Sequence, residues 1–100
     1  MSEEEKKVIQ EIRDHILKCG GSYSAWYVGI AQDPRTRLFN DHAVNEKSDA
    51  WIFRKVSSSD SARNIEQYFV ETLKTDGDTG GGDNNTDSVY AYKRNNHTDP

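Results

Sequence analysis

The most informative part of the chain reads Tyr27-Val28-Gly29-Ile30-Ala31-Gln32-Asp33-Pro34-Arg35-Thr36-Arg37. The apolar run at its start predicts a buried strand. Asp33 and Pro34 then predict the start of a helix, because aspartate caps a first turn and proline is preset for it. Arg37 lies one turn into that helix. This strand-turn-helix is expected to bring Tyr27, Gly29 and Arg37 close together at an exposed junction.

Helices and strands are predicted to alternate along the rest of the chain. The predicted elements are a helix at 2–18, a strand at 22–30, a helix at 34–43, a strand at 50–56, a helix at 59–74 and a strand at 89–93. This order, α-β-α-β-α-β, predicts an α+β fold in which a small sheet of about three strands is flanked by helices. We expect one domain over residues 1–94, with helix 2–18 as an N-terminal addition and residues 95–100 as a disordered tail.

Helix 2–18 carries the clearest local signals. Ser2 and Glu5 have the spacing of a capping box, and Gly20-Gly21 end the helix. We expect its apolar stripe to pack on the domain's own sheet, the alternative being a helix that binds a partner. The segment 76–87 is rich in glycine and predicts a loop.

The composition is that of a small polar domain with an aromatic core. Of 100 residues 33% are hydrophobic, and the mean hydropathy is −0.97. Two Trp, five Tyr and three Phe each bury a large area, which favours a folded chain over disorder. No apolar run is long enough to span a membrane, so we expect no membrane partner. A single cysteine, Cys19, excludes an intrachain disulfide and, with no signal peptide in view, favours a cytoplasmic protein.

The charge is acidic, with a net value of −4 and a pI of about 5.3. Such a balance is not typical of a non-specific nucleic-acid binder, whose affinity comes from Lys and Arg on phosphates. The acidic residues concentrate at the N-terminus and in 76–87, so the overall charge understates any local basic face. The candidates for that face are Arg35, Arg37, Arg54, Lys55, Arg63, Lys93 and Arg94.

An ordered set of features over residues 25–74 resembles the GIY-YIG nuclease family. Tyr27-Val28-Gly29 is similar to the second tripeptide of the family signature, and Arg37 follows at the family's ten-residue offset. A strand comes next. The segment Ile65-Glu66-Gln67-Tyr68-Phe69 then resembles the helix that carries the family's single metal-binding glutamate.

The resemblance implies a metal-dependent endonuclease that hydrolyses DNA phosphodiester bonds. Tyr27 would activate water or contact phosphate, and Gly29 would permit a close backbone approach. Arg37, with Arg35 beside it, would bind the phosphate. Glu66 would hold one Mg²⁺ or Mn²⁺ ion. These residue types suit the chemistry, because negative charge builds on the phosphate oxygens and a cation and a guanidinium fork offset it.

The family's first tripeptide lies on a strand that forms a hairpin with the second. Here Gly21-Ser22-Tyr23 is too close to the second tripeptide for two full strands. We expect the C-terminal strand at 89–93 to take that place by pairing beside Trp26–Ile30. Tyr90 and Tyr92 would then supply the second catalytic tyrosine in a permuted arrangement.

Plainer interpretations of the same residues stay open. Tyr27 suits a core aromatic as well as a site residue, Gly29 suits close strand packing, and Arg37 and Glu66 suit surface charges. His42 lies one residue away from where many family members keep a histidine. The alternative function is a catalytically inactive module that keeps the fold and binds a protein or nucleic-acid partner, or a second copy of itself. Convergence of Glu66, Arg37 and a tyrosine hydroxyl on one cleft would favour the enzyme.

Overall fold

The structure, a computed structural model, describes residues 1–77 and 83–100. In chain order its elements are α1 (Glu3–Cys19), the 3₁₀ turn η1 (Tyr23–Ala25), β1 (Trp26–Ala31), α2 (Pro34–Thr36), η2 (Arg37–Asp41), β2 (Trp51–Lys55), α3 (Ser59–Gln67), η3 (Tyr68–Thr72) and β3 (Ser88–Lys93). The predicted α+β fold, a small sheet flanked by helices, is confirmed. Residues 78–82 of the predicted loop lie outside the described residues.

Within the described part of the chain, the strands form an antiparallel sheet in the order β1-β3-β2. The last strand of the sequence is therefore the central one. Tyr27 lies opposite Tyr92, and Gly29 lies opposite Tyr90. The prediction that the C-terminal strand pairs beside Trp26–Ile30 is confirmed. Because paired residues project to the same side of a sheet, these three tyrosines share one face with Gly29.

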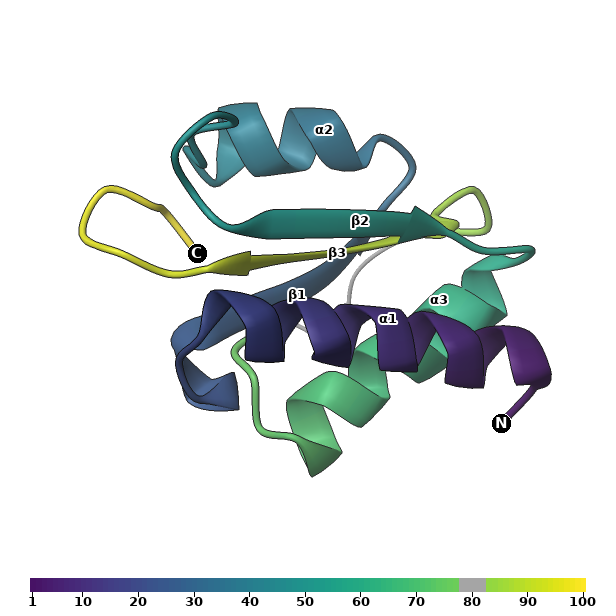
Figure 1. Cartoon of the computed structure of the whole chain (residues 1–100). Coiled ribbons are helices and arrows are strands. Elements are labelled where there is room, and N and C mark those ends of the chain that lie inside the picture. The colour runs from purple at the N-terminus through teal and green to yellow at the C-terminus, as the bar shows by residue number, and fades with distance from the viewer. Residues whose placement is uncertain (78–82) are drawn as a thin grey trace.

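The sheet separates two layers of helices (Figure 1). α1 and α3 cover one face, where an aliphatic and aromatic core forms. The buried residues of this core include Val8, Ile9, Ile12, Ile16, Trp26, Val28, Ile65, Phe69, Val89 and Ala91. α2 and η2 cover the other face, where Leu38 packs with Tyr90 and Tyr92. The alternation of side chains along β3 thus gives the sheet one apolar face and one tyrosine-rich face.

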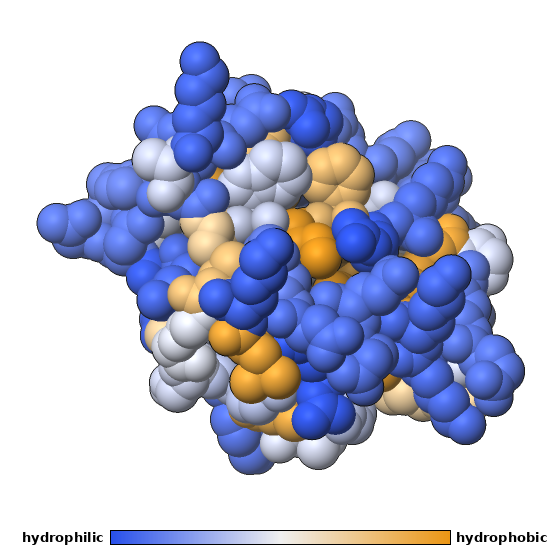
Figure 2. Space-filling view, in the orientation of Figure 1, coloured by the Kyte–Doolittle hydropathy of each residue, from blue (hydrophilic) through white to orange (hydrophobic). Residues whose placement is uncertain are grey.

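α1 packs on the sheet by its predicted apolar stripe. The predicted capping box is present, since Ser2 Oγ accepts from the Glu5 N–H at 3.1 Å and the Glu5 carboxylate accepts from the Ser2 N–H at 3.2 Å. Figure 2 shows a largely hydrophilic surface on this side, with hydrophobic groups scattered over it. Val8, Ile9, Ile12 and Ile16 of the predicted stripe are buried in the core, whereas Leu17, which was also assigned to it, is 70% exposed.

The helix predicted at 34–43 begins as expected and then widens into the π-turn η2. In that turn the His42 N–H donates to the Arg37 carbonyl at 2.9 Å. Ala43, with a φ of 58°, ends the element. α3 follows the same course, starting at the N-cap Ser58 and passing into the π-turn η3. Both predicted helices are therefore found, but each ends in a π-turn and stops two residues before its predicted end.

Residue Asp76 pairs with the outer edge of β1. The Val28 N–H donates to the Asp76 carbonyl at 2.9 Å, and the Asp76 N–H donates to the Trp26 carbonyl at 2.8 Å. A Cβ on the next residue, Gly77, would lie 2.5 Å from the Val28 carbonyl oxygen, so the approach requires glycine. These contacts cover part of the edge of β1 that does not face β3.

The segment 95–100, expected to be disordered, folds back toward η2 and the loop that follows it. The Asp99 N–H donates to the His42 carbonyl at 2.8 Å, and Asn95 Nδ2 donates to the Asp49 carboxylate at 3.0 Å. The structure therefore gives this segment fixed partners in the middle of the chain.

Across residues 1–77 and 83–100, no helix combines the length and the apolar character that crossing a bilayer requires.

Candidate active site

A cleft of about 370 Å³ opens at the outer edge of β1, with α2 and η2 on one side and α3 on the other. Tyr27 and Gly29 come from β1, Arg37 from η2, Glu66 from α3 and Tyr90 from β3. The remaining lining residues are Ile30, Ala31, Gln32, Asp33, Thr36 and Thr86. Five of the candidate site residues, which come from four different elements, therefore lie around one cavity.

The contact between Gly29 and Tyr90 fixes the floor of the cleft. The two residues are paired across β1 and β3. A Cβ on Gly29 would lie 2.5 Å from the Tyr90 hydroxyl oxygen and 2.6 Å from the ring carbon that bears it. Glycine is therefore required here because the Tyr90 ring crosses over the strand, whereas its backbone torsions are ordinary. The close packing that the sequence suggested for Gly29 is present.

Arg37 reaches the cleft from the start of η2. Asp33 secures that start, since its carboxylate accepts from the Thr36 N–H at 3.3 Å and from the Thr36 hydroxyl at 2.8 Å. The Arg37 Nε lies 3.2 Å from Asp41, and 49% of the Arg37 side chain is exposed. The guanidinium therefore stands at the rim, in contact with solvent.

Glu66 enters from the layer on the other side of the sheet. It follows the core residue Ile65 on α3 and is only 1% exposed, yet it lines the cleft. Burial is the main cause that raises the pKa of Tyr90, and the charges of Tyr27 and Glu66 raise it further while Arg37 lowers it. Glu66, Arg37 and Tyr90 are thus within electrostatic reach of one another, and the surface-charge interpretation of Glu66 is excluded.

His42 connects the tyrosines beneath the cleft. Its Nε2 lies 2.8 Å from the Tyr90 hydroxyl and its Nδ1 lies 3.1 Å from the Tyr92 hydroxyl. Its ring centroid is 4.7 Å from that of Tyr27. The residue is 5% exposed, and burial lowers the pKa of the imidazole, which is therefore neutral near pH 7.

The π-turn explains why Arg37 and His42 act on the same tyrosine. In an α-helix of 3.6 residues per turn, positions five apart point in different directions. The i to i+5 hydrogen bond of η2 instead stacks them. Arg37 and His42 therefore approach Tyr90 from one element. His42 can be read from the sequence, but no sequence signal indicates the π-turn. The position of His42 relative to Arg37 could therefore not be predicted.

Two nominated residues lie outside the cleft. Tyr92 is fully buried and contacts His42 instead of the cavity, and burial raises its pKa. Arg35 forms an ion pair with Glu46 and lies over the rings of Phe39 and Trp51, at 5.2 and 5.8 Å. Arg35 therefore faces the opposite edge of the sheet from the cleft.

The cleft offers hard oxygen ligands to a metal ion. The carboxylates of Glu66 and Asp33 both belong to residues that line it. No cluster of three His, Cys, Asp or Glu side chains suited to a metal is present among the residues that the structure describes. Mg²⁺ is commonly bound through one or two carboxylates while it keeps several waters, so this donor set fits such an ion. It does not fit a structural zinc site, which needs four protein ligands.

Searches against protein-family models, curated proteins and solved structures find no match to this chain.

Proposed function

We propose that the protein is a metal-dependent endonuclease that hydrolyses DNA phosphodiester bonds at the cleft beside β1. The observation that carries the proposal is the convergence of Tyr27, Arg37, Glu66 and Tyr90, from four elements, on one cavity. Side chains of these types gathered from distant parts of a chain are typical of a built site. A cytoplasmic location and a DNA substrate are parts of the same proposal.

The roles follow from position. Arg37 stands at the rim with half of its side chain exposed, where it can take hold of a phosphate and offset the charge that develops on it. Glu66 would hold one Mg²⁺ or Mn²⁺ ion. When bound, the ion would supply a Lewis acid for the phosphate oxygens. Burial of the floor strengthens these electrostatic interactions, because the local dielectric constant is low.

Tyr90 and His42 provide a path for the proton of the attacking water. Burial raises the pKa of Tyr90, so a preformed tyrosinate is disfavoured. The Tyr90 hydroxyl can accept the water proton while it passes its own proton to His42 Nε2, 2.8 Å away. The new P–O bond forms as the bond to the leaving sugar oxygen breaks, and that oxygen leaves with a proton from solvent. His42 returns its proton to water afterwards.

The sheet order supports the family resemblance. β3 takes the position beside β1 that the first strand of the family signature would hold, and it presents Tyr90 opposite Gly29. The π-turn η2 holds one residue more per hydrogen-bonded ring than an α-helix. This extra residue supports the resemblance, because it matches the one-residue offset of His42.

The test is cleavage of supercoiled plasmid and branched DNA with Mg²⁺ or Mn²⁺. We expect Glu66→Gln and Arg37→Ala to lower the rate by about a hundredfold or more, because each removes a group that stabilises charge in the transition state. Glu71→Gln and Arg13→Ala are matched controls outside the cleft and should cut at the wild-type rate. Unchanged cutting by Glu66→Gln, or no cutting by folded wild type, would overturn the proposal.

The second candidate is a module that binds nucleic acid without cutting it. The specific observation in its favour is the surface formed by Arg35, Phe39, Trp51 and Phe53, where the guanidinium lies over two rings and the Trp51 and Phe53 rings are stacked at 6.0 Å. Aromatic rings beside arginine suit unpaired bases. Binding of single-stranded DNA that Trp51→Ala abolishes, with no cleavage in any metal, would support this candidate over the enzyme.

A further inference from the structure

His42 is held between the sheet and the segment 95–100. On one side its ring contacts the hydroxyls of Tyr90 and Tyr92. On the other side its Nδ1 lies 2.7 Å from the main-chain carbonyl oxygen of Asp99. The Asp99 N–H donates to the His42 carbonyl at 2.8 Å, so the two residues are joined by a main-chain bond and a side-chain bond.

These contacts determine which ring nitrogen carries the proton. A carbonyl oxygen can only accept, so His42 Nδ1 must carry a hydrogen to bond to Asp99. In neutral imidazole the other nitrogen then has a lone pair. Nε2 is therefore an acceptor, and the Tyr90 O–H donates to it. The same arrangement leaves the Tyr92 oxygen as a second acceptor near Nδ1.

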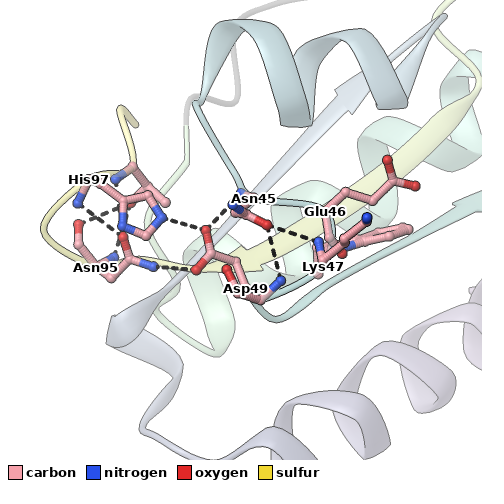
Figure 3. A network of polar contacts seen from close by, with 9 residues as sticks. Asn45, Glu46, Lys47, Asp49, Asn95 and His97 are labelled. Atoms are coloured by element: carbon pink, nitrogen blue, oxygen red, sulfur yellow. Dashed lines mark hydrogen bonds and ion pairs between the residues drawn. The ribbon is translucent and has the colours of Figure 1, made fainter.

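A polar network ties the residues just before Asp99 to the loop that follows η2 (Figure 3). Asp49 is its centre: its side chain is 8% exposed, and it accepts from His97 Nε2 at 2.6 Å and from the Asn45 N–H at 2.7 Å. Asn95 donates to the same carboxylate at 3.0 Å. These hydrogen bonds lower the pKa of Asp49 against the opposing effect of burial, so the carboxylate is charged at neutral pH.

The sequence around Asp99 adds a restriction on its main chain. Pro100 follows it, and a residue before proline is confined mainly to extended torsions. The direction of the Asp99 carbonyl is thus limited from one side by the proline and from the other by the network at Asp49.

We propose that segment 95–100 is a positioning element of the candidate site, in which the Asp99 carbonyl holds His42 as the Nδ1–H tautomer and so presents Nε2 to Tyr90. Asp49, His97 and Asn95 act through Asp99 and touch no reacting atom. The catalytic consequence rests on the proposed function, because only there does Tyr90 move a proton. The tautomer itself is a property of the folded chain and can be measured without any substrate.

The experiment compares two substitutions at one position in the full chain. Asp99→Ala keeps the N–H and the carbonyl and should leave His42 unchanged. Asp99→Pro removes the N–H that bonds to His42 and should release the carbonyl as well. The ring nitrogens are read by ¹⁵N NMR on histidine-labelled protein. We expect one pure Nδ1–H tautomer in the wild type and Asp99→Ala, and a mixture of both tautomers in Asp99→Pro.

A second variant keeps the inference falsifiable if Asp99→Pro does not fold. Asp49→Ala removes the anchor of the network from outside the site and should give the same mixture of tautomers. A wild-type His42 that carries its proton on Nε2 would overturn the inference, as would a folded Asp99→Pro or Asp49→Ala with an unchanged pure tautomer.

Plasmid cleavage separates this inference from the function on which it builds. If the proposed function holds, Asp99→Pro should lower kcat by about tenfold or more with little change in KM, because proton transfer and not binding is affected. If no variant cuts DNA but the tautomer shifts as expected, the positioning role stands and the endonuclease proposal fails.

Discussion

Gly29 allows the Tyr90 hydroxyl to lie directly over β1, where β1 pairs with β3. The Tyr90 ring lies across the place where a Cβ would project. From that position the Tyr90 hydroxyl reaches His42 Nε2, 2.8 Å away. The absence of a side chain at Gly29 therefore permits both the position of Tyr90 in the cleft and its contact with His42.

Gly29→Ala is expected to lower the free energy of unfolding by about 1–3 kcal/mol, the usual cost of forcing an extra methyl group into a packed site. Urea denaturation measures the change. In a Tyr90→Ala background the ring is gone, and the same substitution should cost clearly less. Equal losses in the two backgrounds would mean that the clash with Tyr90 is not the cause.

His42 should make stability depend on pH. Burial lowers its pKa in the folded state below the unfolded value of about 6.5. Between the two pKa values the unfolded chain binds more protons, so the free energy of unfolding falls as the pH drops below about 6.5 and levels off below the folded pKa. The charged groups nearest the ring pull both ways, with Arg37 lowering its pKa and Asp41 and Asp99 raising it.

The measurement is the urea midpoint at several pH values between 5 and 8 (roughly the range in which histidine titrates). His42→Gln should flatten the slope. His15, whose pKa burial also lowers, supplies a comparison, because His15→Gln should remove only its own part. A slope that His42→Gln leaves unchanged would contradict the assignment.

Among the elements, the π-turn η2 decides how Arg37 and His42 lie relative to each other. The second π-turn, η3, begins after the part of α3 that carries Glu66. The N-caps could be predicted, since Asp33 and Ser58 are residue types that bond to free N–H groups. The π-turns could not, because nothing in the residue types of 37–41 or 68–72 distinguishes a wide turn from an α-helical one. Tertiary contacts select it.

Ser58→Ala should destabilise the protein by about 1 kcal/mol, because the Ser58 hydroxyl accepts from the Ser61 N–H at 3.1 Å and alanine leaves that group without its cap. Ser58→Gly, which lets water reach the same group, should cost only a few tenths of a kcal/mol. Thermal or urea unfolding of the pair gives the difference. If alanine is tolerated as well as glycine, the cap does not stabilise α3.

Gly77→Ala tests the pairing of Asp76 with β1. The new Cβ would strike the Val28 carbonyl oxygen, a backbone atom that cannot turn aside. Hydrogen exchange of the Val28 amide should become about tenfold faster or more, as expected for a strained site that opens more easily. The Lys93 amide, bonded to Ala50 on the far side of β3, is the internal control. Equal acceleration at both amides would point to general destabilisation instead.

For the whole molecule, the sequence was sufficient for the classes and order of the elements but not for every contact between them. The alternation at 89–93 and the missing first strand together predicted where β3 pairs, and hence how Tyr90 meets Gly29. Segment 95–100 was expected to be disordered because its residues are polar and terminal. Its docking depends on Asp49 and His42, which are some 50 residues away in sequence, and no local pattern reports a contact of that range.

A chain that ends at residue 87 should not form the sheet. Among the strands that the structure describes, β1 and β2 are both outer strands and each pairs with β3, so the shortened chain lacks the partner strand of both. Far-UV circular dichroism should show loss of the strand signal and of cooperative unfolding. Addition of a peptide that covers 83–100 should restore both. A shortened chain that still unfolds cooperatively with native strand content would contradict this dependence.

The central place of β3 also sets an order of events during synthesis. A ribosome adds about 5–20 residues per second and releases the chain from its N-terminal end. α1, β1, β2 and α3 all emerge before the strand that joins them. The nascent chain therefore has local helices but exposed aromatic strands, a state that attracts chaperones and other nascent chains. The walls of the cleft therefore come together in one late step, when β3 pairs with β1 and β2.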